Sequence, residues 1–176
     1  METTTKSSAT NNGLYLGAIL SIITVLIYAV NLDLFTEWWL GIVLFIVVVA
    51  FGVISAVKSR TILGGFMSFK QAFTSYFITI LVGTIISTVV GIVIFTFIDP
   101  EAATYVNEQI LVVTKQTMER FGMPQEAMQA ALEEAAKNDN FSLGMQFKNF
   151  VFGLAFYALI GLIVALIVKK TDVKDA

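Results

Sequence analysis

The sequence predicts an all-α integral membrane protein: a bundle of four transmembrane helices with an extracytoplasmic amphipathic helical hairpin between spans three and four. The first observation is that 57% of the 176 residues are hydrophobic and only 14% are charged, which is too apolar for the surface of a soluble domain. The second is that four stretches without any charged residue each have about the 20 residues that a helix needs to cross a bilayer. These stretches are residues 14–30, 38–57, 77–98 and 150–168.

The composition also excludes most kinds of site chemistry. The chain contains no cysteine and no histidine, so thiol nucleophiles, imidazole bases and the usual zinc or haem ligands are missing. A metal site at Glu133, Glu134 and Asp139 is disfavoured, because neighbouring carboxylates on a helix point apart and oxygen ligands must converge. A net charge of −2 with scattered cations argues against nucleic-acid binding. We therefore expect no enzyme activity, metal, cofactor or nucleic-acid partner.

The chain begins with a polar leader and the first span. Residues 1–13 are rich in threonine, serine and asparagine, a composition that predicts a disordered leader. The apolar stretch 14–30 is longer than the core of a typical signal peptide and is followed by no small-x-small cleavage site. We therefore expect it to be retained as a transmembrane helix.

Residues at the boundaries place spans two and three at about 38–57 and 69–98. Thr36 is positioned to cap the start of span two, because a threonine hydroxyl can accept a hydrogen bond from the first free amides of a helix. Ser68 and Gln71 have the spacing of a capping box. Span three is therefore expected to begin before the hydrocarbon core.

Residues 99–146 predict the helical hairpin, because the composition changes there from apolar to Glu, Gln, Ala and Lys. Asp99 can cap the first amphipathic helix, and Gly122 suits the left-handed residue that would end it. Such a hairpin buries one face by packing on itself and on the mouth of the bundle; the alternative is that it docks a partner or the membrane surface. The docking candidates are Val113, Met118, Phe121, Met128 and Leu132.

The fourth span is expected at 147–170, followed by a short cytoplasmic tail at 171–176. Cations favour the cytoplasmic side of a membrane protein, and seven of the eleven fall in the leader, the second link and the tail. Both termini are therefore predicted to be cytoplasmic, although the four cations of the third link oppose this assignment. The seven are Lys6, Lys58, Arg60, Lys70, Lys169, Lys170 and Lys174.

Small residues recur at helical spacing within the spans, where they let helix backbones approach closely. We expect them to pack the bundle internally, and homodimerisation through one remaining face is the alternative. The helix-packing candidates are Gly13, Gly17, Gly83, Ser87, Gly91, Gly153 and Gly161.

Span three also carries several hydroxyl groups. Thr79, Thr84, Ser87 and Thr88 could line a polar path, but such side chains commonly bond to the backbone of their own helix. A transporter would need a cavity beside them.

Five short motifs stand near the element boundaries: GLYLG at 13–17, WWLG at 38–41, GGFMSFKQAF at 64–73, FIDP at 97–100 and GMPQE at 122–126. With these motifs the chain resembles, from about residue 13 to 170, the family of domain of unknown function 4199, small four-span membrane proteins of Bacteroidota. The resemblance implies a bacterial inner-membrane protein with the architecture described above. It implies no activity and no catalytic residues.

We interpret the sequence as a non-enzymatic structural, accessory or partner-binding membrane protein. Its expected partners are the lipid bilayer and a protein or a second copy of the chain, held through the hairpin or the small-residue faces. The alternative is a small-solute or lipid-handling transporter.

Overall fold

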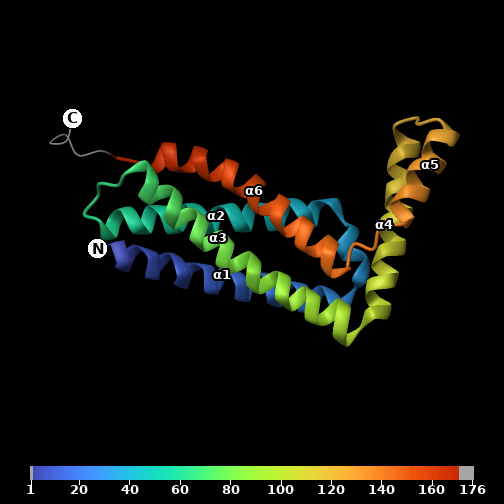
Figure 1. Cartoon of the computed structure of the whole chain (residues 1–176), viewed down its shortest axis with the longest axis horizontal. Helices are drawn as coiled ribbons and strands as arrows, with labels where there is room; N and C mark the ends of the chain where they lie inside the picture. The colour runs from blue at the N-terminus through green and yellow to red at the C-terminus, as the bar shows by residue number, and fades with distance from the viewer. Residues whose placement is uncertain (1, 171–176) are drawn as a thin grey trace.

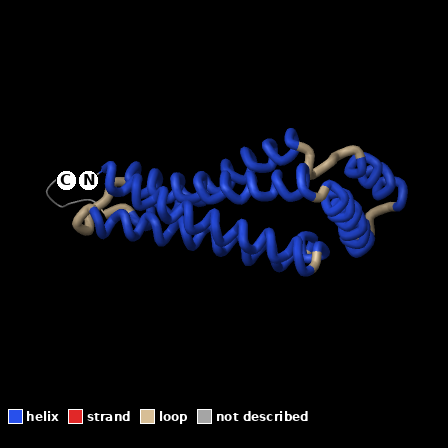
Figure 2. The backbone as a smooth tube through the Cα atoms, turned by 90° about the horizontal axis from the view of Figure 1, so that it is seen from below, coloured by secondary structure: helices blue, strands red, loops and turns tan. Residues whose placement is uncertain are grey.

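The computed structural model describes residues 2–170, and that part of the chain is helical apart from short links (Figures 1 and 2). Four of its helical segments are long and apolar enough to cross a membrane, so the chain is a multi-pass membrane protein. The third of these combines α3 with the π-helical turn η2. In order, the elements are α1 (Glu2–Val30), the 3₁₀ turn η1 (Leu32–Thr36), α2 (Trp38–Ile62), α3 (Phe69–Ile92), η2 (Val93–Ile98), α4 (Pro100–Arg120), α5 (Gln125–Ala136) and α6 (Leu143–Val168).

The four spans lie alongside one another, and the connections divide the molecule into two ends (Figure 1). The terminal end holds the start of α1, the loop between α2 and α3, and the end of α6. The far end holds η1, α4 and α5, and α4 lies across it at a large angle to the spans (Figures 1 and 2).

The predicted disorder of the leader is wrong for residues 2–13, because α1 begins at Glu2. Thr5, Ala9 and Asn12 lie on one face of α1 and are buried. The hydroxyl of Thr79 on α3 donates a hydrogen bond to the backbone oxygen of Ala9 at 2.9 Å. Tertiary contacts therefore order a segment whose composition is that of a disordered chain. Residue 1 and the expected tail at 171–176 lie outside the described residues.

Most of the predicted helix ends are confirmed. The Ser68–Gln71 capping box is present at the start of α3, Asp99 accepts the cap bond from the amide of Ala102, and Gly122 has a φ of +68° after α4. The expected Thr36 cap is wrong: its hydroxyl donates to the backbone oxygen of Asp33, and Glu37 precedes α2 without a side-chain cap. Span four begins earlier than 147, because Ser142 caps α6 and its first turn starts at Leu143.

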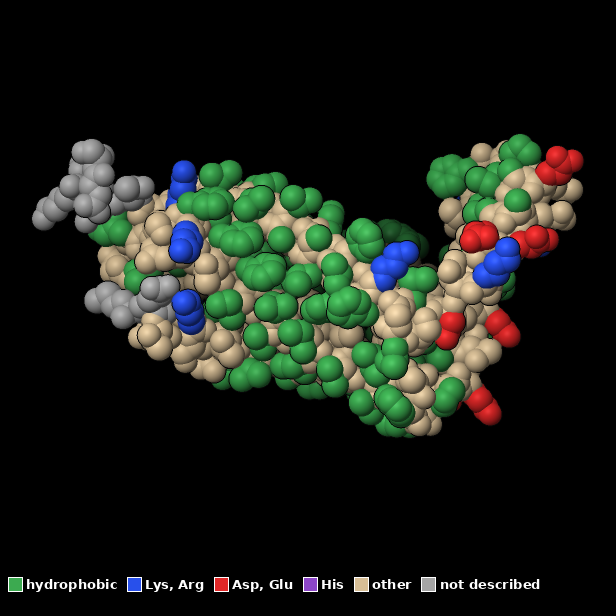
Figure 3. Space-filling view, in the orientation of Figure 1, with side chains coloured by type: hydrophobic (Ala, Val, Ile, Leu, Met, Phe, Trp, Pro, Cys, Tyr) green, Lys and Arg blue, Asp and Glu red, His purple; other side chains and the backbone are tan. Residues whose placement is uncertain are grey.

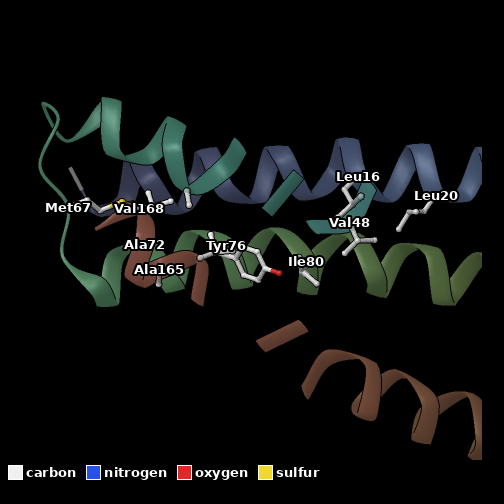
Figure 4. Close-up of a cluster of buried hydrophobic side chains, with 11 residues drawn as sticks. Leu16, Leu20, Val48, Met67, Ala72, Tyr76, Ile80, Ala165 and Val168 are labelled. Atoms are coloured by element: carbon white, nitrogen blue, oxygen red, sulfur yellow. The ribbon is translucent and has the colours of Figure 1, made fainter. Parts of the chain in front are cut away.

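Tyr76 of α3 is fully buried within the main hydrophobic core (Figure 4), and its ring is held between glycines of two other helices. A Cβ atom built on Gly52 of α2 would lie 2.5 Å from Cε2 of Tyr76, and one on Gly161 of α6 would lie 2.6 Å from its Cδ1. Real Cβ atoms essentially never come so close. Only glycine therefore fits on either side of this ring.

A buried hydroxyl network lies next to Tyr76 and links three helices. The hydroxyl of Thr79 is within 2.7 Å of the Ser55 hydroxyl on α2, and it also lies 3.0 Å from the backbone oxygen of Ser75. Thr79 and Ser55 are fully buried. In lipid such bonds favour association because the alternative is an unpaired polar group in hydrocarbon.

The predicted packing glycines fall into two groups. Gly13 and Gly17 of α1 press against Val82 and Ile86 of α3, and Gly83 of α3 presses against Leu16 of α1; with Gly161, these four sites would place a Cβ within 2.9 Å of a neighbour. Gly91 and Gly153 differ, since no described atom outside their immediate chain surroundings lies within 4 Å of a built Cβ. Ser87 is half-buried. α3 and α6 are thus in close contact at Tyr76 and separate toward the far end.

This contrast predicts that replacing glycine by alanine destabilises the protein at Gly161 and not at Gly153, although both residues lie on α6. Gly161→Ala should lower the free energy of unfolding by about 1–3 kcal/mol, since the ring of Tyr76 is also confined by Gly52 and cannot move aside. Gly153→Ala is the matched control and should not destabilise the protein. Thermal unfolding of both variants in detergent measures the difference, and equal stability of the two would contradict the packing described.

Candidate functional site

The site candidate is a groove between α3 and α6 in the half of the bundle nearer the far end. It has a volume of about 360 Å³, within the usual range for ligand sites. In Figure 1 the two helices diverge in this direction. The lining residues are Thr84, Thr88, Gly91, Asn140, Phe141, Gln146, Asn149, Phe150, Gly153, Leu154 and Tyr157.

The α3 wall and the α6 wall of the groove have simple helical patterns. Thr84, Thr88 and Gly91 recur at intervals of four and three residues, so they form one narrow stripe of small side chains on α3. On α6 the lining runs from Gln146 to Tyr157, which is about 16 Å along a helix. That length is roughly half of the ~30 Å hydrocarbon core. The α6 wall of the groove is therefore about as long as one leaflet is thick.

Polarity changes along the groove. Amide side chains of Asn140, Gln146 and Asn149 lie toward the far end, whereas Gly153 and Leu154 lie deeper in the span. The side-chain amide of Gln146 donates to the backbone oxygen of Phe141 at 2.7 Å, which leaves its own oxygen as an acceptor. Within residues 2–170, Asn149 makes no side-chain hydrogen bond. The mouth can therefore bond to a polar group, while the depth of the groove is mostly apolar, with the hydroxyls of Thr84, Thr88 and Tyr157 as its polar groups.

No charged or metal-binding group contributes to this described lining. The carboxylates of the hairpin lie elsewhere: Glu134 accepts a bond from Lys137 at 3.4 Å, and Asp139 accepts one from Asn107 at 2.8 Å. The described residues contain no cluster of three or more acidic side chains that could hold a metal ion. The groove has the groups for binding a neutral or headgroup-bearing molecule, and it lacks a nucleophile with an adjacent base.

Asn107 of α4 fixes the loop at the mouth of the groove. Its side-chain nitrogen donates to Asp139, and its side-chain oxygen accepts from both the backbone and the side chain of Asn140, at 3.2 and 2.9 Å. The ring of the next residue, Phe141, packs against Phe95 with the centroids 4.6 Å apart and the ring planes tilted by 43°. The hairpin and η2 thereby position Asn140 and Phe141 at the polar rim, the end of the groove that carries the amides of Asn140, Gln146 and Asn149.

Two tyrosine–aspartate bonds and an aromatic cluster hold α4 on the far end. Tyr28 donates to Asp99 at 3.0 Å, and Tyr105 donates to Asp33 at 2.7 Å. The rings of Tyr28 and Phe35 pack edge-on against Phe95. These contacts attach the first half of α4 to the end of α1 and to η1 and η2.

The hairpin residues predicted to dock a partner are only partly accessible. Met128 is buried, and Met118 and Leu132 are half-buried, in a hairpin where α4 and α5 pack together. Val113 and Phe121 are exposed, at 37% and 85%. Much of the predicted docking stripe is therefore used inside the hairpin.

Sequence reasoning identified Thr84, Thr88, Gly91 and Gly153 as residues of interest, but it did not bring them together or assign them to a groove. It missed the amides at the rim. Gln146 and Asn149 are three residues apart at the start of α6, and such an i, i+3 polar pair on a membrane helix was the available signal.

The fold defines the class of protein: a small multi-pass membrane protein with four spanning helices and a helical hairpin. A family model matches residues 11–170 with the description "Protein of unknown function (DUF4199)", and the chain belongs to that family. No curated protein and no solved structure matches the chain.

Asn107→Ala should release the rim of the groove. The substitution removes three hydrogen bonds, one of them to the carboxylate of Asp139. Since even one neutral bond is worth about 1 kcal/mol, hydrogen exchange at the amides of Asn140 and Phe141 should accelerate at least several-fold. Asn138→Ala is the matched control, because the side chain of Asn138 bonds only to the backbone oxygen of Glu134 in α5. Unchanged exchange in the Asn107 variant would show that the rim is held by other contacts.

The Tyr105–Asp33 bond predicts a pH dependence. The hydrogen bond to Asp33 is the main cause that raises the pKa of the Tyr105 hydroxyl above its ordinary 10.0. Stabilisation by a raised pKa is complete below pH 10.0 and is lost as the pH rises through the folded value. The difference in tyrosinate absorbance between the native protein and Tyr105→Phe, followed against pH, reports on Tyr105 alone. Its midpoint should therefore lie above pH 10.0, and Asp33→Asn should lower that midpoint. A midpoint at or below 10.0 would refute the bond.

Proposed function

We propose that this protein is a non-enzymatic accessory protein of the membrane that binds a lipid-like amphiphile in the groove between α3 and α6. The observation that supports the proposal is the polarity of this groove. Its rim carries the amides of Asn140, Gln146 and Asn149. Its depth is walled mainly by small or apolar groups such as Gly153 and Leu154, together with the hydroxyls of Thr84, Thr88 and Tyr157.

An amphiphile is the kind of molecule that matches such a lining. A polar headgroup would bond to the amides at the rim, while one hydrocarbon chain would lie along the ~16 Å between Gln146 and Tyr157. The volume of about 360 Å³ suits one chain and part of a headgroup better than a whole transmembrane helix, which is about 10 Å wide. The ligand would enter sideways from the bilayer, because both walls are membrane helices.

Binding is better supported than transport across the membrane. Beyond the end of the groove, α3 meets α6 at Tyr76 and Gly161. Of the hydroxyls that a polar path would use, Thr79 is fully buried in its hydrogen-bond network, and Thr84 and Thr88 face the groove. A ligand in the groove would thus remain in one leaflet.

The same proposal includes the orientation of the chain in the membrane. Six of the ten described cations lie on elements at the terminal end, and the other four lie on the hairpin or at the start of α6. Acidic side chains gather on the hairpin (Figure 3). The six at the terminal end are Lys6, Lys58, Arg60, Lys70, Lys169 and Lys170. The preference of cations for the cytoplasm supports cytoplasmic termini and an outer-leaflet groove. The family resemblance supports the inner membrane of a bacterium.

Filling the groove should abolish ligand binding without unfolding the protein. Gly153→Leu places a side chain where no described atom lies within 4 Å of the Cβ, so it should occupy the space of the hydrocarbon chain. Gly41→Leu on α2 is the matched control, because Gly41 also has open space around it and does not line the groove.

Native mass spectrometry of protein extracted with its membrane lipids measures the result. The native chain and Gly41→Leu should retain one lipid-sized adduct, and Gly153→Leu should lose at least nine-tenths of it while melting at a similar temperature. Equal adducts in all three proteins would overturn the proposal. A dimer without adduct that Gly153→Leu converts to monomer would instead make the groove a site for a second copy of the chain.

A further inference from the structure

A second depression lies between the start of α2 and the last two turns of α4. Its volume is about 560 Å³, and it shares no lining residue with the groove between α3 and α6. The residues that line it are Thr36, Glu37, Trp38, Val113, Gln116, Thr117 and Arg120.

This depression lies at the edge of the bilayer. Trp38 is the first residue of a spanning helix and is 76% exposed, and tryptophan is typical of the membrane interface. α4 crosses the end of the bundle at the same level (Figure 1). In Figure 3 hydrophobic side chains lie on the hairpin tip toward the spans, and most acidic ones lie on the side away from them. Through Trp38 the depression therefore adjoins the exposed surface of the spanning helix α2.

Four of the lining residues belong to one face of α4. Val113, Gln116, Thr117 and Arg120 follow one another at intervals of three, one and three residues, which keeps them on one side of a helix. The hydroxyl of Thr117 donates to the backbone oxygen of Val113. The amide of Gln116 and the guanidinium of Arg120 make no such bond within the described residues and remain as donors toward the depression.

Two opposite charges share the depression without pairing. Within residues 2–170, the carboxylate of Glu37 and the guanidinium of Arg120 have no partner of opposite charge within 4.0 Å. They are therefore more than 4.0 Å apart, and a molecule that carries both charges can bridge them. The arrangement is complementary to a zwitterion.

We propose that this depression holds the headgroup of a zwitterionic membrane phospholipid with a primary ammonium group. Arg120 and Gln116 donate to the phosphate, since an arginine fork fits phosphate oxygens, and Glu37 accepts from the ammonium. Val113 and Trp38 contact the apolar part of the same lipid. An anionic headgroup fits less well, because it leaves Glu37 without its partner and adds charge beside it. The site is independent of the proposed function and would anchor the hairpin to the membrane surface.

The test uses the full chain in detergent, with Trp39→Phe as background so that the fluorescence of Trp38 reports on the site. The probes are short-chain phosphatidylethanolamine and short-chain phosphatidylglycerol. The first should bind about tenfold more tightly than the second, the difference expected for one charge-assisted bond. Arg120→Gln should weaken both probes about tenfold. Glu37→Gln should weaken phosphatidylethanolamine alone and so remove the preference.

Lys115→Gln is the matched control, because Lys115 is an exposed residue of the same helix that pairs with Glu119, and it should change neither affinity. Loss of the preference in Glu37→Gln distinguishes headgroup recognition from a merely structural effect of the substitution. Equal binding of the two lipids by the native chain, or an unaltered affinity in Arg120→Gln, would overturn the proposal. So would equally tight binding of soluble phosphoethanolamine, because the ligand would then not be a membrane lipid.

Discussion

The arrangement of the spans depends on the contact of the Tyr76 ring with Gly52 on one side and Gly161 on the other. Lipid provides no hydrophobic drive for helix association, so close packing and buried hydrogen bonds must supply it. A large flat ring between two residues without side chains gives three helices a single fitted contact. The Thr79 network beside it then adds α1. The described spans thereby assemble near the terminal end without using a charged residue in their shared core.

α6 is held tightly against α3 near the terminal end and separates from it toward the far end. α6 meets α3 closely at Gly161 and not at Gly153, and the space between the two helices becomes the groove. The far end compensates for this separation with its own contacts, because Asn107 and the ring of Phe141 tie the loop before α6 to the hairpin and to η2. The hairpin is thus part of the groove's structure as well as a surface element.

The features that sequence predicted correctly depend on local chemistry. Apolar length identifies a span, and the caps at Ser68, Asp99 and Gly122 need only neighbouring residues. The leader was predicted wrongly because Thr5, Ala9 and Asn12 gain their burial from distant helices. The groove could not be predicted for the same reason. Gly153 and Gly161 look alike in sequence, and only the tilt of α6 makes Gly161 a packing residue and Gly153 part of the groove wall.

Photocrosslinking with a membrane phospholipid that carries a photoreactive acyl chain tests the central claim most directly. Crosslinked residues would be mapped by peptide mass spectrometry on the native chain in its membrane. The account predicts adducts concentrated on Thr88, Leu154 and Tyr157 of the groove, above those on Ile163 and Leu166, which are exposed elsewhere on α6. Adducts spread evenly over all exposed apolar residues of α6 would contradict it, since the separation of α3 and α6 would then hold no bound lipid.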